Sequence, residues 1–70
     1  MFRVVFSPGL RTSENEEVSY YDLTFKEAIK IFKKLIKAQL DKKTAVLKVT
    51  NDGLLANDHL RNKITLEIVL

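Results

Sequence analysis

One amphipathic segment, residues 24–40, constrains the fold of this 70-residue chain more than any other feature. At about 100° per residue, its apolar side chains spread over roughly 200° of a helix surface. They are Phe25, Ala28, Ile29, Ile31, Phe32, Leu35, Ile36, Ala38 and Leu40. Five lysines gather on the opposite side: Lys26, Lys30, Lys33, Lys34 and Lys37. The pattern predicts a helix that packs on an apolar surface and turns its lysines to water.

The start of this helix is well specified. Thr24 and Glu27 have the spacing of a capping box, in which each side chain satisfies a backbone N–H of the first turn. The end is marked only by the polar residues 41–43, so it could shift by a residue or two.

Four other segments alternate apolar and polar residues with the period of two that indicates strands. They cover residues 2–7, 17–22, 44–50 and 63–70, and a long polar loop joins the first two. Their inward side chains are expected to be Phe2, Val4, Phe6, Val18, Tyr20, Ala45, Leu47, Val49, Ile64, Leu66, Ile68 and Leu70. Asn51-Asp52-Gly53 is a turn signal, and the following residues 54–62 are expected to form an irregular loop.

These elements predict one α+β domain over residues 1–70, with the order β-β-α-β-β and one helix on a four-stranded sheet. The helix spans about 25 Å, so it can carry the chain back between parallel second and third strands. The strand order is then 1-2-3-4 or 2-1-4-3, with the first and last strands parallel. We favour 2-1-4-3 because the second strand carries Glu17, Ser19 and Asp22, as an edge strand often does.

The element order and the closing strand TLEIVL resemble the ubiquitin-like β-grasp family over the whole chain, in pattern and without a specific motif. Ubiquitin-like modifiers and sulfur carriers end in a flexible tail with paired glycines. This chain instead ends on its last strand at Leu70. The resemblance therefore implies a β-grasp-like arrangement, and it implies neither conjugation nor sulfur-carrier chemistry.

Composition narrows the class of protein. The chain is 46% hydrophobic and 30% charged, with two glycines and one proline, as in a folded domain. It has no cysteine, which excludes disulfides and thiolate metal sites. No apolar run reaches membrane-spanning length, and the first run is only as long as a strand, so we expect a cytoplasmic protein. The net charge of +3 makes it mildly basic.

The only histidine, His59, gives little support for catalysis. Nucleophilic catalysis needs a nucleophile, a base and an orienting group that converge, so Asp58 and a carboxylate such as Glu67 would have to meet His59 in a pocket. The spacing of Asp52, Asp58 and His59 fits neither a calcium loop nor a zinc site. We therefore predict no enzyme, no cofactor and no metal.

The sheet face away from the helix is the better candidate. A single helix covers one face, so the other should show the partner-binding set Arg3, Val5, Tyr21, Val46, Lys48, Glu67 and Val69. Val5 and Val69 are expected to be neighbours. A half-apolar face rimmed by charge favours a small binding or accessory protein that contacts a protein partner or forms a homodimer. The alternative is that these valines merely reflect β-propensity.

The lysine face of the helix offers a second function, non-specific nucleic-acid binding. Lysines along one helix face can follow a phosphate backbone. No arginine, asparagine or aromatic residue lies among them to read or stack on bases. Such rows are also the ordinary wet side of a helix. A short, cysteine-free chain rich in lysine and asparagine is also in keeping with a phage or plasmid accessory protein.

Overall fold

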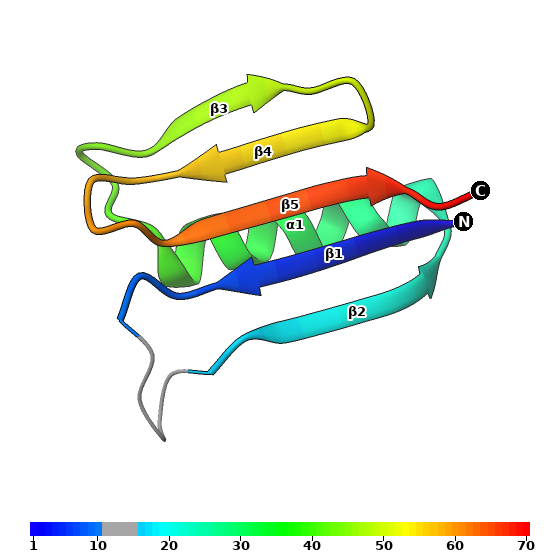
Figure 1. Ribbon diagram of the computed structural model, residues 1–70, viewed down its shortest axis with the longest axis horizontal. Coiled ribbons are helices and arrows are strands. Elements are labelled where there is room, and N and C mark those ends of the chain that lie inside the picture. The colour runs from blue at the N-terminus through cyan, green and yellow to red at the C-terminus, as the bar shows by residue number, and fades with distance from the viewer. Residues whose placement is uncertain (11–15) are drawn as a thin grey trace.

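The computed structural model describes residues 1–10 and 16–70, and in these residues five antiparallel strands form one sheet with one helix against it (Figure 1). The part of the predicted first loop at residues 11–15 lies outside the described residues. The elements are β1 (Phe2–Ser7), β2 (Val18–Leu23), α1 (Phe25–Gln39), β3 (Val46–Val49), β4 (Gly53–Asn57) and β5 (Lys63–Ile68). The α+β class is confirmed.

The helix α1 forms as predicted. Thr24 is its N-cap, and the Thr24 Oγ1 accepts a hydrogen bond of 3.2 Å from the Glu27 N–H. The Thr24 N–H donates to the Glu27 carboxylate at 2.9 Å, so both arms of the capping box are present. The hydrogen bond from the Thr24 backbone lowers the pKa of Glu27 below its ordinary value. Leu40 caps the other end.

The core lies between α1 and the two central strands. Its buried members are Val4, Phe6, Ala28, Phe32, Leu40, Ala56, Ile64 and Leu66. Phe25 was expected on the packed face, but α1 begins where β2 ends, and its side chain stays 57% exposed beside Phe2, with ring centroids 5.2 Å apart. Ile68 and Leu70, expected inward, are also exposed because β5 ends at Ile68.

The prediction of a loop over residues 54–62 is wrong for its first part, because Gly53–Asn57 is strand β4. The Thr50 N–H donates to the Gly53 carbonyl at 2.9 Å and closes a tight turn after β3. The chain then runs straight back along β3, with Val49 opposite Leu54 and Val46 opposite Asn57. A turn followed at once by apolar residues gains ladder hydrogen bonds that an irregular loop would lack.

The extra strand also changes the strand order. The sheet has the order β2-β1-β5-β4-β3, so the predicted order 2-1-4-3 is wrong. Because β4 reverses the chain once more, β5 runs antiparallel to β1, with Phe2 opposite Ile68 and Ser7 opposite Lys63. The expected parallel central pair, and with it the β-grasp-like arrangement, is not found.

Strand β3 lies beyond the helix (Figure 1). The helix packs against β1, β5 and β2. A helix about 10 Å wide shields about two strands spaced about 4.8 Å apart, so the insertion of β4 moves β3 out of its shelter. Ala45, Leu47 and Val49 were expected to point into the core, and all three are exposed. That part of the prediction is wrong for this reason.

Candidate functional site

The middle of the face away from α1 is occupied by an ion pair. Arg3 and Glu67 are opposite each other on β1 and β5, and the Arg3 guanidinium donates to the Glu67 carboxylate. This hydrogen bond, and the charge of Glu67, raise the pKa of Arg3 above its ordinary value. Two members of the predicted partner-binding set therefore already satisfy each other.

The other members of that set do not gather into one apolar patch. Val5 faces Thr65, whereas the Val69 N–H donates to the Met1 carbonyl at 2.8 Å. The predicted contact between Val5 and Val69 is therefore wrong, because antiparallel pairing places Val69 opposite the start of β1. Tyr21 lies on β2 at one edge of the sheet, and the remaining members, Val46 and Lys48, lie on β3 at the other.

The best candidate site is the β3 edge, which we define as Val46, Leu47, Lys48 and Val49. Three of its side chains are apolar and well exposed: Val46 is 49%, Leu47 is 61% and Val49 is 84% exposed. In the described residues, β3 is hydrogen-bonded to a strand only on its β4 side. Leu47 and Val49 face the side of the sheet that carries α1, and Val46 and Lys48 face the open side.

The turn geometry shows which backbone groups of β3 point outward. The Thr50–Gly53 hydrogen bond makes that pair a hydrogen-bonded one, and such pairs alternate along an antiparallel ladder. Lys48 and Val46 then direct their N–H and C=O groups to β4. Leu47 and Val49 direct theirs to solvent. The same two residues therefore carry both exposed apolar side chains and outward backbone groups.

The opposite edge of the sheet is less suited to pairing. The register between β1 and β2 shifts between Phe2 and Val4, and Asp22 has a φ of 55°. Bulges of this kind twist an edge strand and disrupt the regular row of outward groups that another strand would need. The pairing of β3 with β4 has no such shift, so β3 is the regular edge.

The predicted nucleic-acid set remains on the surface. Lys26, Lys30, Lys33, Lys34 and Lys37 are all exposed on α1. Lys42 and Lys43, in the turn after the helix, are exposed as well. These two lysines add positive charge between the end of α1 and the start of β3.

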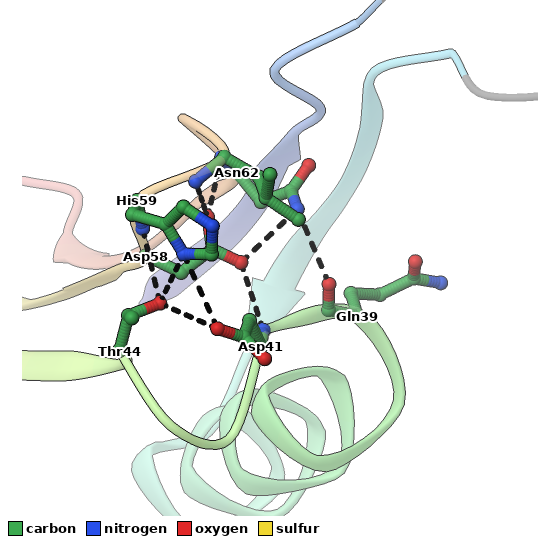
Figure 2. A network of polar contacts seen from close by, with 7 residues as sticks. Gln39, Asp41, Thr44, Asp58, His59 and Asn62 are labelled. Atoms are coloured by element: carbon green, nitrogen blue, oxygen red, sulfur yellow. Dashed lines mark hydrogen bonds and ion pairs between the residues drawn. The ribbon is translucent and has the colours of Figure 1, made fainter.

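A polar cluster around Asp58 ties the end of α1 to the turn between β4 and β5 (Figure 2). Asp58 is 8% exposed. Its carboxylate accepts hydrogen bonds from the backbone N–H groups of Asp41 (2.8 Å), Leu60 (3.0 Å) and Asn62 (3.0 Å). It also accepts one from the Asn62 side chain at 3.1 Å. Asp58 therefore acts as a cap for two connections at once.

His59 joins this cluster through its backbone N–H, which donates to the Thr44 Oγ1 at 3.2 Å, and through one ring nitrogen. Its Nδ1 lies 2.7 Å from the Thr44 Oγ1 and 3.2 Å from the Asp41 carboxylate, and the Thr44 hydroxyl donates to that carboxylate at 2.8 Å (Figure 2). In a nucleophile relay the hydroxyl and the carboxylate contact different ring nitrogens. Here both meet Nδ1, and Glu67 is held by Arg3 elsewhere, so the geometry is that of a structural cap.

The acidic residues considered as metal ligands are also separated. Asp52 and Asp58 flank opposite ends of β4. Among residues 1–10 and 16–70, no group of three or more histidine, cysteine, aspartate or glutamate side chains is placed to hold a metal ion.

The predicted partner-binding set contained Val46 and Lys48 of the β3 edge but not Leu47 and Val49, because these two residues were expected in the core. A signal for the missing strand was present in Asn51-Asp52-Gly53 followed by two leucines. A hairpin at that turn makes β3 the last strand of the sheet, farthest from the helix, and so exposes it.

Two further findings bear on the class of protein. Within the described residues, no helix combines the length and the apolar character needed to cross a membrane. No protein-family model, curated protein or solved structure matches this chain significantly. The function therefore has to be inferred from the residues of this chain.

Proposed function

We propose that this protein is a small non-enzymatic binding module that receives a strand of a protein partner at the β3 edge. One observation carries the proposal: Leu47 and Val49 expose large apolar side chains and turn their backbone N–H and C=O groups to solvent at the same edge. In strand addition, such backbone groups supply affinity and the alternating side chains supply specificity.

The two faces of an added strand would meet different surroundings. On the side that carries α1, its side chains contact Leu47 and Val49. On the open side they contact Val46 and Lys48, which were already in the predicted partner-binding set. A protein partner thus remains the ligand, and its contact lies at the edge of the sheet and not in the middle of the open face. A suitable partner segment is extended and apolar on one face, with a polar or acidic group near Lys48.

Proline at position 47 tests this mechanism. Proline is tolerated in an edge strand where its missing N–H faces solvent, so Leu47→Pro should fold. It should lose partner binding, because it removes an outward donor and obstructs the incoming strand. The partner is first recovered by photo-cross-linking from a photoreactive residue at position 47, and its binding to purified wild-type and variant protein is measured by calorimetry.

Matched controls make the result interpretable. Leu47→Thr keeps the outward N–H and should weaken binding by only about tenfold. A photoreactive residue at Tyr21, which is 60% exposed against 61% for Leu47, should not give the adduct. Unchanged binding by folded Leu47→Pro, or equal cross-linking from Tyr21, would refute strand addition at β3.

As a second candidate we propose non-specific nucleic-acid binding by the lysine face of α1. It is supported by the exposure of all five helix lysines and of Lys42 and Lys43. Each phosphate neutralised by a lysine contributes about −0.9 to the slope of log affinity against log salt concentration. This function would leave the β3 edge uninvolved.

A charge-reversed variant distinguishes the second candidate. If the lysine face binds duplex DNA, Lys30→Glu/Lys33→Glu/Lys37→Glu should reduce the magnitude of the salt slope by about 3 and abolish binding near 0.15 M salt. The measurement is fluorescence anisotropy with a labelled duplex at several salt concentrations. Leu47→Pro serves as the control and should bind like wild type. No binding by the wild-type protein at low salt would eliminate this candidate.

A further inference from the structure

We infer that the strand received at the β3 edge is β3 of a second copy of this chain, paired antiparallel about a two-fold axis that passes beside Leu47. The inference rests on the proposed function and names its partner. It would join two five-stranded sheets into one continuous ten-stranded sheet, with both helices on the same face.

The backbone restricts how two β3 edges can pair. Only residues with outward N–H and C=O groups can form the hydrogen-bonded pairs of the new ladder. On this edge they are Leu47 and Val49, because the Ala45 N–H already donates to the Asp41 carbonyl at 2.9 Å and Ala45 can offer only its C=O. Two antiparallel registers use them with substantial overlap. In one, Leu47 pairs with Leu47 of the second copy; in the other, Leu47 pairs with Val49.

The charge of Lys48 selects between these registers. The pairing of Leu47 with Val49 places Lys48 directly opposite Lys48 of the second copy, and opposed like charges destabilise a sheet. The pairing of Leu47 with itself places Lys48 opposite Val46 and Val49 opposite Ala45. It also makes one apolar cluster of the four exposed Leu47 and Val49 side chains. The structure therefore favours the register centred on Leu47.

The ends of the edge are complementary in charge. Antiparallel pairing brings the turn between β3 and β4 of one copy beside the turn that precedes β3 of the other. The first turn carries the exposed Asp52, and the second carries the exposed Lys42 and Lys43. In the register centred on Leu47, the two-fold axis brings these two oppositely charged turns together at both ends of the edge.

Single cysteines test the register, because the natural chain has none. Hydrogen-bonded antiparallel partners are about 5.5 Å apart between Cα atoms, a distance that a disulfide can bridge. In the proposed register the two copies of residue 48 are about 8 Å apart and those of residue 49 about 14 Å apart. Under mild oxidation, Leu47→Cys should therefore form disulfide-linked dimers at least about tenfold faster than Lys48→Cys or Val49→Cys.

Tyr21→Cys, of matched exposure on the other edge, gives the rate of random collision. Fastest linkage of Lys48→Cys would overturn the register, and linkage of Leu47→Cys no faster than Tyr21→Cys would overturn the second copy as partner.

Sedimentation measures the association itself. The wild-type mass should approach that of two chains with rising concentration. Asp52→Lys should weaken this self-association several-fold, and Lys42→Asp/Lys43→Asp in the same chain should rescue it. A wild-type protein that stays monomeric while a different protein binds at position 47 would refute the self-pairing and leave strand addition standing.

Discussion

Replacing Asp58 with alanine is expected to destabilise the fold by about 3 kcal/mol, a large share of the stability of a domain this small. The Asp58 carboxylate accepts four hydrogen bonds, three from backbone N–H groups and one from the Asn62 side chain. Alanine leaves these donors without their charged acceptor at the junction of α1 with the turn between β4 and β5. Urea unfolding followed by circular dichroism measures the change.

Asp52→Ala is the matched control, because Asp52 is an exposed aspartate at the other end of β4. It should change the free energy of unfolding by no more than about 0.5 kcal/mol. An equal effect of the two substitutions would show that Asp58 is an ordinary surface aspartate, and the structural role assigned to the Asp58 cluster would then be wrong.

Acid should weaken the same cluster. Burial raises the pKa of Asp58, but its hydrogen bonds from Asp41, Asn62 and Leu60 outweigh burial and leave the pKa below the ordinary value. The folded state therefore binds the proton less readily than the unfolded state. The stability that Asp58 contributes is complete above its unfolded pKa and is lost as pH falls through its folded pKa.

The expected result is a smaller acid dependence in Asp58→Asn than in the wild type. Below about pH 4 the free energy of unfolding of the wild type should fall more steeply than that of Asp58→Asn. Parallel curves for the two proteins would contradict the assigned direction of the pKa.

The second large effect is expected from Gly53→Ala. A Cβ atom at position 53 would lie 1.9 Å from the Leu66 carbonyl oxygen, which belongs to the backbone of central strand β5. Gly53 also has a φ of 159°, at the limit of what a residue with a side chain adopts. To accommodate the methyl group, β4 must move away from β5, and we expect a loss of about 3 kcal/mol or more.

Thermal and urea unfolding of Gly53→Ala, beside Asn51→Ala in the same turn, measures this effect. Asn51 is exposed, so its substitution should cost about 0.5 kcal/mol or less. Amide exchange in Gly53→Ala should be accelerated first along β4 and β3. A variant as stable as the wild type would contradict the close approach of β4 and β5 at this position.

Local signals allowed the sequence to predict part of the fold. The capping box of Thr24 and Glu27 and the helical period fixed α1 to within one residue at each end. The alternation of Val4 and Phe6, and of Ile64 and Leu66, identified the two strands that bury the most apolar surface. Each of these features depends on residues close together in the chain.

The number of strands, in contrast, depends on pairing between residues that are far apart in the chain. Leu54 and Leu55 are adjacent apolar residues, so β4 shows no clear alternation, and its pairing with β3 on one side and β5 on the other determines its structure. That strand in turn decides the direction of β5 and the position of β3. The exposure of Leu47 and Val49 therefore could not be predicted from their own pattern, which resembles that of a core strand.

The outward N–H groups of Leu47 and Val49 give the most direct test of the β3 edge as the binding surface. We expect their amide hydrogen exchange, followed by NMR, to be fast in dilute protein, while Lys48, whose N–H is directed to β4, exchanges slowly. When the edge is occupied, at high protein concentration or with the cross-linked partner, exchange at Leu47 and Val49 should slow by about a hundredfold, with Lys48 little changed. Unchanged exchange at Leu47 and Val49 in a complex whose contacts map elsewhere would contradict strand addition at β3.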